Sequence, residues 1–385
     1  MERNVKVMTI YIENVEIWNI NSEPTHNSLL LSNRQIHVGY NSEPNAEIID
    51  GTGLIAMPGF IDIHIHGAMG ADVMDATDEA FQQMASALVE EGTTSFLATT
   101  MTQTDEAIER ALKNLAGFTS HPTKSQMIGI HLEGPFINSI RAGAQQQQYM
   151  RSANWLTFQA WQTLSQNKIK VLTIAPELIT DDFIEQVSKE GIVVSAGHTD
   201  ATSKQIQNAQ QKGLRSITHL YNQMSPFHHR EIGVVGEALQ NHHLYCEIIV
   251  DGVHCSADAV NFAYRNKGAD RLILITDAMR AKGLPGGTYD LGGQMVYVKN
   301  DARLADGTLA GSILKMIDAV KNMRTFTQCS PSDLVKMSSY NACQLLNIEN
   351  CGMIVDGYKA DIVLLNEQFE VMYTIINGEV AYRAV

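Results

Sequence analysis

Two histidines one residue apart, His64 and His66, end an apolar run that begins at Phe60. Side chains at positions i and i+2 of a strand point the same way, so both imidazoles can reach one cation. Further residues of metal-ligand or proton-transfer type end later β-like runs: Glu133, His198, His219 and Asp277. Imidazole nitrogen and carboxylate oxygen together suit Zn²⁺, Fe²⁺, Mn²⁺ or Co²⁺. The set therefore predicts a divalent-metal site, with one or two ions per subunit, of the kind that metal-dependent hydrolases use.

Each of these residues also has an ordinary structural explanation. A single His-x-His in a strand is more often structural than metal-binding, and Glu133 could form a salt bridge at the rim of a sheet. His198 and His219 could be hydrogen-bonded core histidines, and Asp277 could cap a helix, because Asp is favoured at that position. Their recurrence at the ends of successive apolar runs favours the metal site over these separate explanations.

The scaffold that must position these residues is indicated by apolar, β-branched runs that recur from residue 60 onwards. The runs cover 60–66, 94–100, 127–133, 170–177, 192–198, 216–222, 245–251 and 272–277. Short continuous apolar runs are typical of strands buried on both faces, and their alternation with helical segments predicts a parallel (β/α)8 TIM-type barrel. A doubly wound open α/β sheet is the alternative. In a barrel, the candidate ligands would share the C-terminal rim, where active sites lie.

The two ends of the chain differ from this central part. Residues 1–57 and 352–385 consist of short strand-like runs separated by turns. They are predicted to pair into one small β-sandwich domain beside a catalytic barrel of residues 58–351. Residues 331–346 are predicted to form a helix, and residues 145–148 a solvated loop that is part of a flap over the site.

Composition restricts the partners of the chain. It has 385 residues, 44% of them hydrophobic and 18% charged, and a net charge of −14. Without a basic stripe, this charge argues against nucleic acid or a membrane surface as a partner. The N-terminus lacks the apolar segment of a signal peptide. The five cysteines form no Cys-x-x-Cys pair, which predicts free thiols in a reducing cytoplasm.

The candidate ligands lie within short motifs. These are His131-Leu-Glu-Gly-Pro-Phe136, Gly197-His-Thr199, Thr218-His-Leu-Tyr-Asn222, His229-Arg230, Val250-Asp-Gly-Val-His254 and Thr276-Asp-Ala278. The tail from Gly352 to Asp361 adds a further match. With these motifs the sequence resembles the amidohydrolase superfamily and, within it, the N-acetylglucosamine-6-phosphate deacetylase family. The resemblance extends over nearly the whole chain.

The resemblance implies roles for individual residues. Glu133, His198 and His219 would bind metal, and Asp277 would be the catalytic acid and base. Substrate contacts would come from Ala144, Asn222, Gln223, Arg230, His254, Leu309, Ala310 and Gly311. Arg230 would bind the sugar phosphate, in some members across a dimer interface. The implied enzyme is a cytoplasmic homodimer of amino-sugar catabolism that converts N-acetyl-D-glucosamine 6-phosphate to D-glucosamine 6-phosphate and acetate.

Two departures from the family pattern bear on this interpretation. Some members replace the His-x-His and use one metal, whereas this chain retains His64 and His66, so a two-metal site bridged by Glu133 is open to it. Position 223 is Gln, where Ala is common.

Other functions stay open at this stage. A deacetylase for the galactosamine epimer is the nearest. A cyclic amidase commonly has a carboxylated Lys at the end of strand four, whereas here that run ends in Glu177 and its Lys170 lies at the opposite end. A non-catalytic scaffold protein would have lost the acid/base residue or several ligands.

Overall fold

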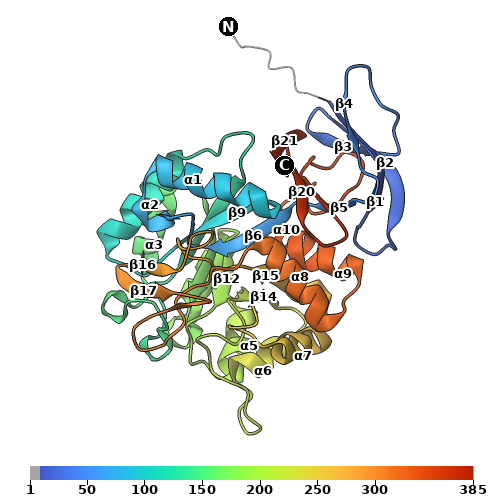
Figure 1. Ribbon diagram of the computed structural model, residues 1–385. Helices are drawn as coiled ribbons and strands as arrows, with labels where there is room; N and C mark the ends of the chain where they lie inside the picture. The colour runs from blue at the N-terminus through green and yellow to red at the C-terminus, as the bar shows by residue number, and fades with distance from the viewer. Residues whose placement is uncertain (1–8, 385) are drawn as a thin grey trace.

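The main body of the computed structural model, which describes residues 9–384, is a closed barrel of parallel strands (Figure 1). Its strands, each hydrogen-bonded to the next, are β6 (Phe60–Ile65), β9 (Thr93–Thr100), β10 (Gln126–Glu133), β11 (Ile169–Ile174), β12 (Val193–Ala196), β13 (Leu214–Ile217), β14 (Tyr245–Ile249) and β15 (Leu272–Ile275). A parallel bridge between Ile65 and Ala278 closes the ring. The predicted barrel is confirmed, and the open-sheet alternative is wrong. The predicted absence of a signal peptide rests partly on residues outside the described range.

The barrel strands read as continuous apolar runs because both of their faces are covered. Every residue of β6, β9, β12, β14 and β15 is buried. One face packs inside the barrel and the other packs under the surrounding helices, as in other parallel sheets.

The surrounding helices begin, in five cases, after a polar residue whose side chain caps the first turn. They are α1 (Asp78–Leu88), α2 (Asp105–Gly117), α3 (Trp155–Leu164), α4 (Asp181–Lys189), α5 (Ser203–Gln211), α6 (Gly233–Gln240), α7 (Ala257–Lys267) and α8 (Met316–Thr327). Side-chain caps that accept a backbone N–H come from Thr77, Thr104, Asn154, Thr202 and Ser256. Among residues 9–384, no helix has the length and apolar character that crossing a membrane requires.

The predicted helix over 331–346 is confirmed, in three consecutive pieces. Ser330 caps α9 (Pro331–Val335), a π-helical turn follows (Lys336–Tyr340), and α10 (Asn341–Leu346) completes it.

The two chain ends form one small β-domain beside the barrel, where blue and red strands lie together in Figure 1. Its strands are β1 (Ile10–Ile17), β2 (Thr25–Ser32), β3 (Gln35–Val38), β4 (Glu47–Asp50), β5 (Ile55–Pro58), β19 (Ile362–Leu365), β20 (Val371–Ile376) and β21 (Glu379–Arg383). They form a single sheet in the order β21-β20-β19-β5-β1-β2-β3, with β4 on β1. Because β5 pairs with both β1 and β19, it joins the two chain ends, and the predicted domain built from both ends is confirmed.

Two small sheets accompany the barrel. The first is a hairpin of β7 (Gly67–Ala68) and β8 (Ala71–Asp72), directly after β6. The second consists of β16 (Gly287–Leu291), β17 (Gln294–Val298) and β18 (Ala302–Arg303). Its buried Leu291 and Val296 pack with Met101 and Met279 in a separate apolar cluster.

The prediction that all five cysteines are free is wrong for one pair. Cys343 of α10 and Cys351 form a disulfide. The chain turns after α10 and brings residue 351 back against the helix, a return that the spacing of the two cysteines does not reveal. Cys246, Cys255 and Cys329 are free and buried.

Candidate metal and catalytic site

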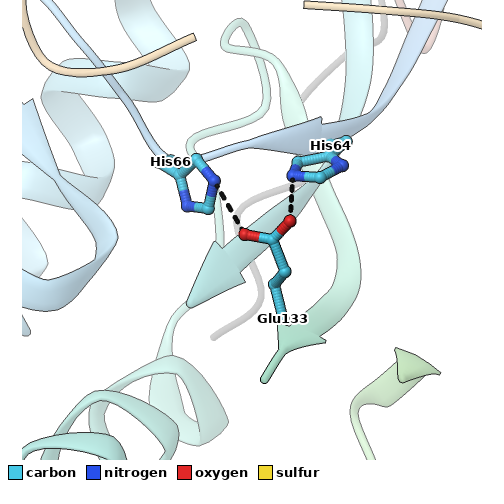
Figure 2. Close-up of side chains that lie close together, drawn as sticks. All are labelled: His64, His66 and Glu133. Atoms are coloured by element: carbon cyan, nitrogen blue, oxygen red, sulfur yellow. Dashed lines mark ion pairs between the residues drawn. The ribbon is translucent and has the colours of Figure 1, made fainter. Parts of the chain in front are cut away.

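The first half of the candidate site is the His-x-His pair at the end of β6. Figure 2 shows both imidazoles pointing at the carboxylate of Glu133, which ends the nearby strand β10. Nε2 of His64 lies 3.4 Å from Oε1 of Glu133, and Nε2 of His66 lies 3.3 Å from Oε2. All three side chains are buried. The predicted alternation along the strand therefore brings both histidines to one carboxylate.

The second half is a further histidine pair on the same carboxylate, and it shares Oε1 of Glu133 with His64. The Nε2 atoms of His198 and His219 are each 3.3 Å from Oε1 of Glu133 and 3.1 Å from each other. Oδ1 of Asp277 lies 3.2 Å from Nε2 of His66. The structure thus brings together every candidate ligand that the sequence predicted, with Glu133 in contact with both histidine pairs.

These donor atoms fit divalent metal ions. Metal–ligand bonds of about 2.0–2.1 Å give a tetrahedron with edges of about 3.3–3.4 Å, and the donor separations above, from 3.1 to 3.4 Å, overlap this range. Within residues 9–384, Nε2 of His64 and Oε1 of Glu133 are buried without a hydrogen-bond partner. Buried polar atoms are normally paired, so both atoms fit a site that holds a cation.

Hydrogen bonds behind two of the imidazoles, those of His198 and His66, fix their orientation. Nδ1 of His198 lies 2.8 Å from the carbonyl oxygen of Arg141, and Nδ1 of His66 lies 3.2 Å from that of Thr99. Because a carbonyl oxygen only accepts, each Nδ1 carries the hydrogen, and each Nε2 presents its lone pair to the centre.

A strained backbone aims three of the ligands. His198, His219 and Asp277 have φ values of 48°, 35° and 48°, in the left-handed region that residues other than glycine seldom adopt. Each follows the last strand residue by two positions, after β12, β13 and β15 respectively. The chain turns there instead of continuing the strand, and such strain concentrates at functional sites.

The pKa values of the site reflect mutual attraction between histidines and carboxylates. Burial alone would lower the pKa of His64, but the charges of Glu133 and Asp277 outweigh it and raise that pKa well above its usual value. Burial likewise opposes the shift of His66, whose pKa the same carboxylates raise to about 9. Burial would raise the pKa of Glu133, yet the histidines hold it well below its usual range. The carboxylates thus stabilise positive charge at this position.

The resemblance-implied substrate contacts fall into two groups. A cavity over the candidate ligands is lined by, among others, Ala144, Asn222, Gln223, His254, Leu309 and Gly311. Ala310 is fully buried and belongs to the apolar cluster of Met101 and Leu291, two residues of that lining. Arg230 is not among the lining residues but lies on an exposed loop, where its guanidinium contacts the ring of His229 at 2.8 Å. Its contact with a phosphate therefore stays a prediction.

The segment 145–148 is only partly the solvated loop that was predicted. Gln147 and Gln148 are exposed, but Gln145 is buried. Its amide donates to Oε2 of Glu133 (2.6 Å), and its carbonyl oxygen accepts from the N–H of Thr102 (2.8 Å). Solvation is wrong for Gln145 because this side chain turns inward to the bridging carboxylate.

Two buried residues in contact with His64 were missed at the sequence level. Nδ1 of His64 lies 3.0 Å from Oε2 of Glu247, and its ring packs edge-on against that of His131, 4.5 Å between centroids. Burial and the neighbouring charge of His64 keep the pKa of His131 well below its usual value. The sequence signal that could have identified Glu247 and His131 is a polar residue inside an apolar run, rather than at the end of that run.

The closed barrel, with histidines and carboxylates gathered at its rim, is the arrangement of a (β/α)8-barrel metal-dependent hydrolase. Residues 55–381 match the Amidohydrolase family, and the chain belongs to that family. The N-acetylglucosamine-6-phosphate deacetylase of Lysinibacillus sphaericus is 48% identical over 335 residues, covering 86% of this chain and 87% of that protein. The enzyme of the same name from Bacillus subtilis (strain 168) is 46% identical over 335 residues, covering 85% of each.

Solved structures agree with these sequence relatives. The crystal structure of the Thermotoga maritima N-acetylglucosamine-6-phosphate deacetylase superposes with a TM-score of 0.89 at 37% identity, covering 97% of this chain and 100% of that one. A mutant of the Mycobacterium smegmatis enzyme in complex with N-acetyl-D-glucosamine-6-phosphate also gives 0.89, at 27% identity, covering 97% and 99%.

Proposed function

We propose that this chain is a metal-dependent deacetylase that converts N-acetyl-D-glucosamine 6-phosphate to D-glucosamine 6-phosphate and acetate. The observation that carries the proposal is the convergence of two histidine pairs on Glu133, with Asp277 beside them. The substrate is proposed from the names of relatives that cover most of the chain.

In the proposed reaction, Asp277 moves the protons. Its side chain is 13% exposed, at the cavity, and its pKa is lowered: burial alone would raise it, but His64 and His66 outweigh burial. A bound divalent metal supplies a water of lowered pKa and polarises the acetyl carbonyl. Asp277 accepts the proton of the attacking water and returns a proton to the amide nitrogen, because an amine anion is too poor a leaving group.

The proposed substrate contacts use the cavity lining and Arg230. Nδ1 of His254 lies 2.6 Å from Oδ2 of Asp251, which orients the ring and leaves Nε2 for a ligand. The guanidinium of Arg230 would bind the phosphate, since its donor fork matches phosphate oxygens and stays charged. A local cation is required because the chain carries a net charge of −14. Its place on an exposed loop suits a phosphate contact in the same subunit or in the partner of a homodimer.

The metal content and setting are proposals as well. The retained His64 and His66 support a site for two ions, drawn from Zn²⁺, Fe²⁺, Mn²⁺ and Co²⁺ according to availability. We propose a cytoplasmic homodimer of amino-sugar catabolism. The cyclic-amidase alternative is disfavoured because such an enzyme would have its carboxylated lysine at the end of strand four. In this chain, strand four is β11, and the residues that follow it are Ala175, Pro176 and Glu177.

The test is release of free amine from N-acetylglucosamine 6-phosphate. Purified protein should release amine and acetate in equal amounts, lose this activity to a chelator, and regain it with added divalent metal. The galactosamine epimer and the unphosphorylated sugar are the matched comparison substrates. Hydrolysis that resists the chelator would refute the proposal, and so would a protein of full metal content that does not hydrolyse N-acetylglucosamine 6-phosphate.

A further inference from the structure

Glu247 is a buried carboxylate on β14 that contacts both halves of the candidate metal site. It is 0% exposed. Its Oε2 lies 3.0 Å from Nδ1 of His64 and also accepts the backbone N–H of His219 at 3.3 Å. His64 belongs to one histidine pair around Glu133 and His219 to the other. One carboxylate oxygen therefore touches a ligand of each pair.

The contact determines which nitrogen of His64 faces the centre. An ionised carboxylate only accepts hydrogen bonds, so Nδ1 of His64 carries a hydrogen. Nε2 then presents its lone pair on the side of Glu133. Among residues 9–384, this nitrogen has no hydrogen-bond partner. His66 and His198 are held by neutral carbonyl oxygens instead. His64 thus has an anionic acceptor, which makes its imidazole the more basic ligand.

The charge of Glu247 also needs a cation. Burying a carboxylate is costly unless it is paired. In the described part of the chain, its ion-pair partner is His64, and its Oε1 has no hydrogen-bond partner. No lysine or arginine of residues 9–384 forms an ion pair with it. The imidazole of His64 therefore connects this carboxylate to the centre of the site, with Nδ1 on Glu247 and Nε2 facing Glu133.

We propose that Glu247 is a positioning residue that commits His64 to metal ligation and, through the backbone of His219, links occupation of the two halves of the site. The inference rests on the proposed metal site. The inference goes beyond the proposed metal site, because it assigns part of the metal affinity to a residue that touches neither substrate nor metal.

The closing experiment compares Glu247→Gln with a matched control, Glu237→Gln. Glutamine is nearly isosteric with glutamate and can still accept from His64, so the variant removes charge with little change of shape. Glu237 is a similarly buried carboxylate, on α6, and it accepts hydrogen bonds from the side-chain amides of Gln207, Gln240 and Asn241, outside the site. The measurements are Zn²⁺ bound per chain by elemental analysis and Zn²⁺ affinity by chelator competition, with the thermal midpoint of each metal-free protein.

Glu247→Gln should weaken Zn²⁺ binding roughly 10- to 100-fold, the usual effect of losing an outer-shell partner, whereas Glu237→Gln should bind like the wild type. Wild-type affinity and stoichiometry in a folded Glu247→Gln protein would overturn the inference alone. A wild-type protein that binds no Zn²⁺ would overturn both the inference and the metal site.

A measurement on the unaltered protein covers the case in which Glu247→Gln does not fold. In ¹⁵N-histidine spectra of the Zn²⁺-loaded wild type, Nδ1 of His64 should carry a slowly exchanging hydrogen, assigned by its loss in His64→Gln. A hydrogen on Nε2 of His64 instead would contradict the role of Glu247.

Discussion

Replacing Asp277 with Asn removes the proposed acid/base group while leaving the shape of the rim intact. Asp277 has a φ of 48°, and Asn tolerates this left-handed region as well as Asp does. Its backbone N–H donates to the carbonyl of His64 (2.8 Å), and its carbonyl accepts from Ser312 (2.7 Å). Both bonds survive the substitution, so the backbone of the rim should keep its conformation.

The expected loss of turnover follows from what the side chain must do. Oδ1 lies 3.2 Å from Nε2 of His66 and 3.5 Å from Nε2 of His64, so the carboxylate directly adjoins the metal ligands. An amide cannot accept the proton of water. Losing a positioned acid/base group costs about 10²- to 10⁴-fold. Because the proposed reaction uses Asp277 for both proton transfers, we expect kcat to fall about 10³- to 10⁴-fold, or about 4–5.5 kcal/mol in the barrier.

The assay is steady-state amine release, with metal content and thermal midpoint measured on the same preparations. Asp182→Asn is the control, because this exposed residue in the first turn of α4 is neither a candidate ligand nor part of the cavity lining. The ions held by Glu133, His198 and His219 should remain in Asp277→Asn. A kcat within tenfold of the wild type at full metal content would refute the assignment of Asp277.

Three further predictions concern binding and stability. Arg230→Ala should raise KM for the phosphorylated sugar about 10-fold or more, with less change in kcat, because hydrogen bonds to a charged group contribute about 1.5–3 kcal/mol. An unchanged KM in steady-state kinetics would exclude Arg230 from the phosphate site. Zn²⁺ at 100 times its Kd should stabilise the metal-free protein by about 2.7 kcal/mol, and a thermal midpoint insensitive to Zn²⁺ would contradict a metal site. Burial alone would raise the pKa of Asp251, but the hydrogen bond from His254 lowers it. A carboxylate whose pKa is lower in the folded state than in the unfolded state stabilises the fold above the unfolded pKa, and this stabilisation is lost as the pH falls. Below about pH 4, the free energy of unfolding of metal-free Asp251→Asn, measured with urea, should therefore decrease less than that of the wild type. An equal pH dependence of the two proteins would argue against this contribution.

Much of the architecture could be predicted because it depends on local patterns. Continuous apolar runs mark strands buried on both faces, and their alternation with helices predicts the barrel that was found. The period of two along a strand places His64 and His66 on one side. Parallel strands around a ring end at one rim, so the positions of Glu133 and Asp277 at run ends already predicted that they meet.

Other features required the folded chain. The spacing of Cys343 and Cys351 did not indicate a disulfide, since it depends on the turn after α10. Gln145 looked like part of a polar loop, yet it turns inward to Glu133. The left-handed backbone at His198 and His219, which aims both side chains, is also invisible in a pattern of residue types.

The sequence by itself therefore determined which residues reach the rim, because strand periodicity and the common direction of parallel strands are local properties. Only the tertiary structure decided which atoms meet there. Glu247 and His64 are separated by 183 positions and touch at 3.0 Å, a contact set by the closure of the ring and the packing of side chains inside it, which no local pattern encodes.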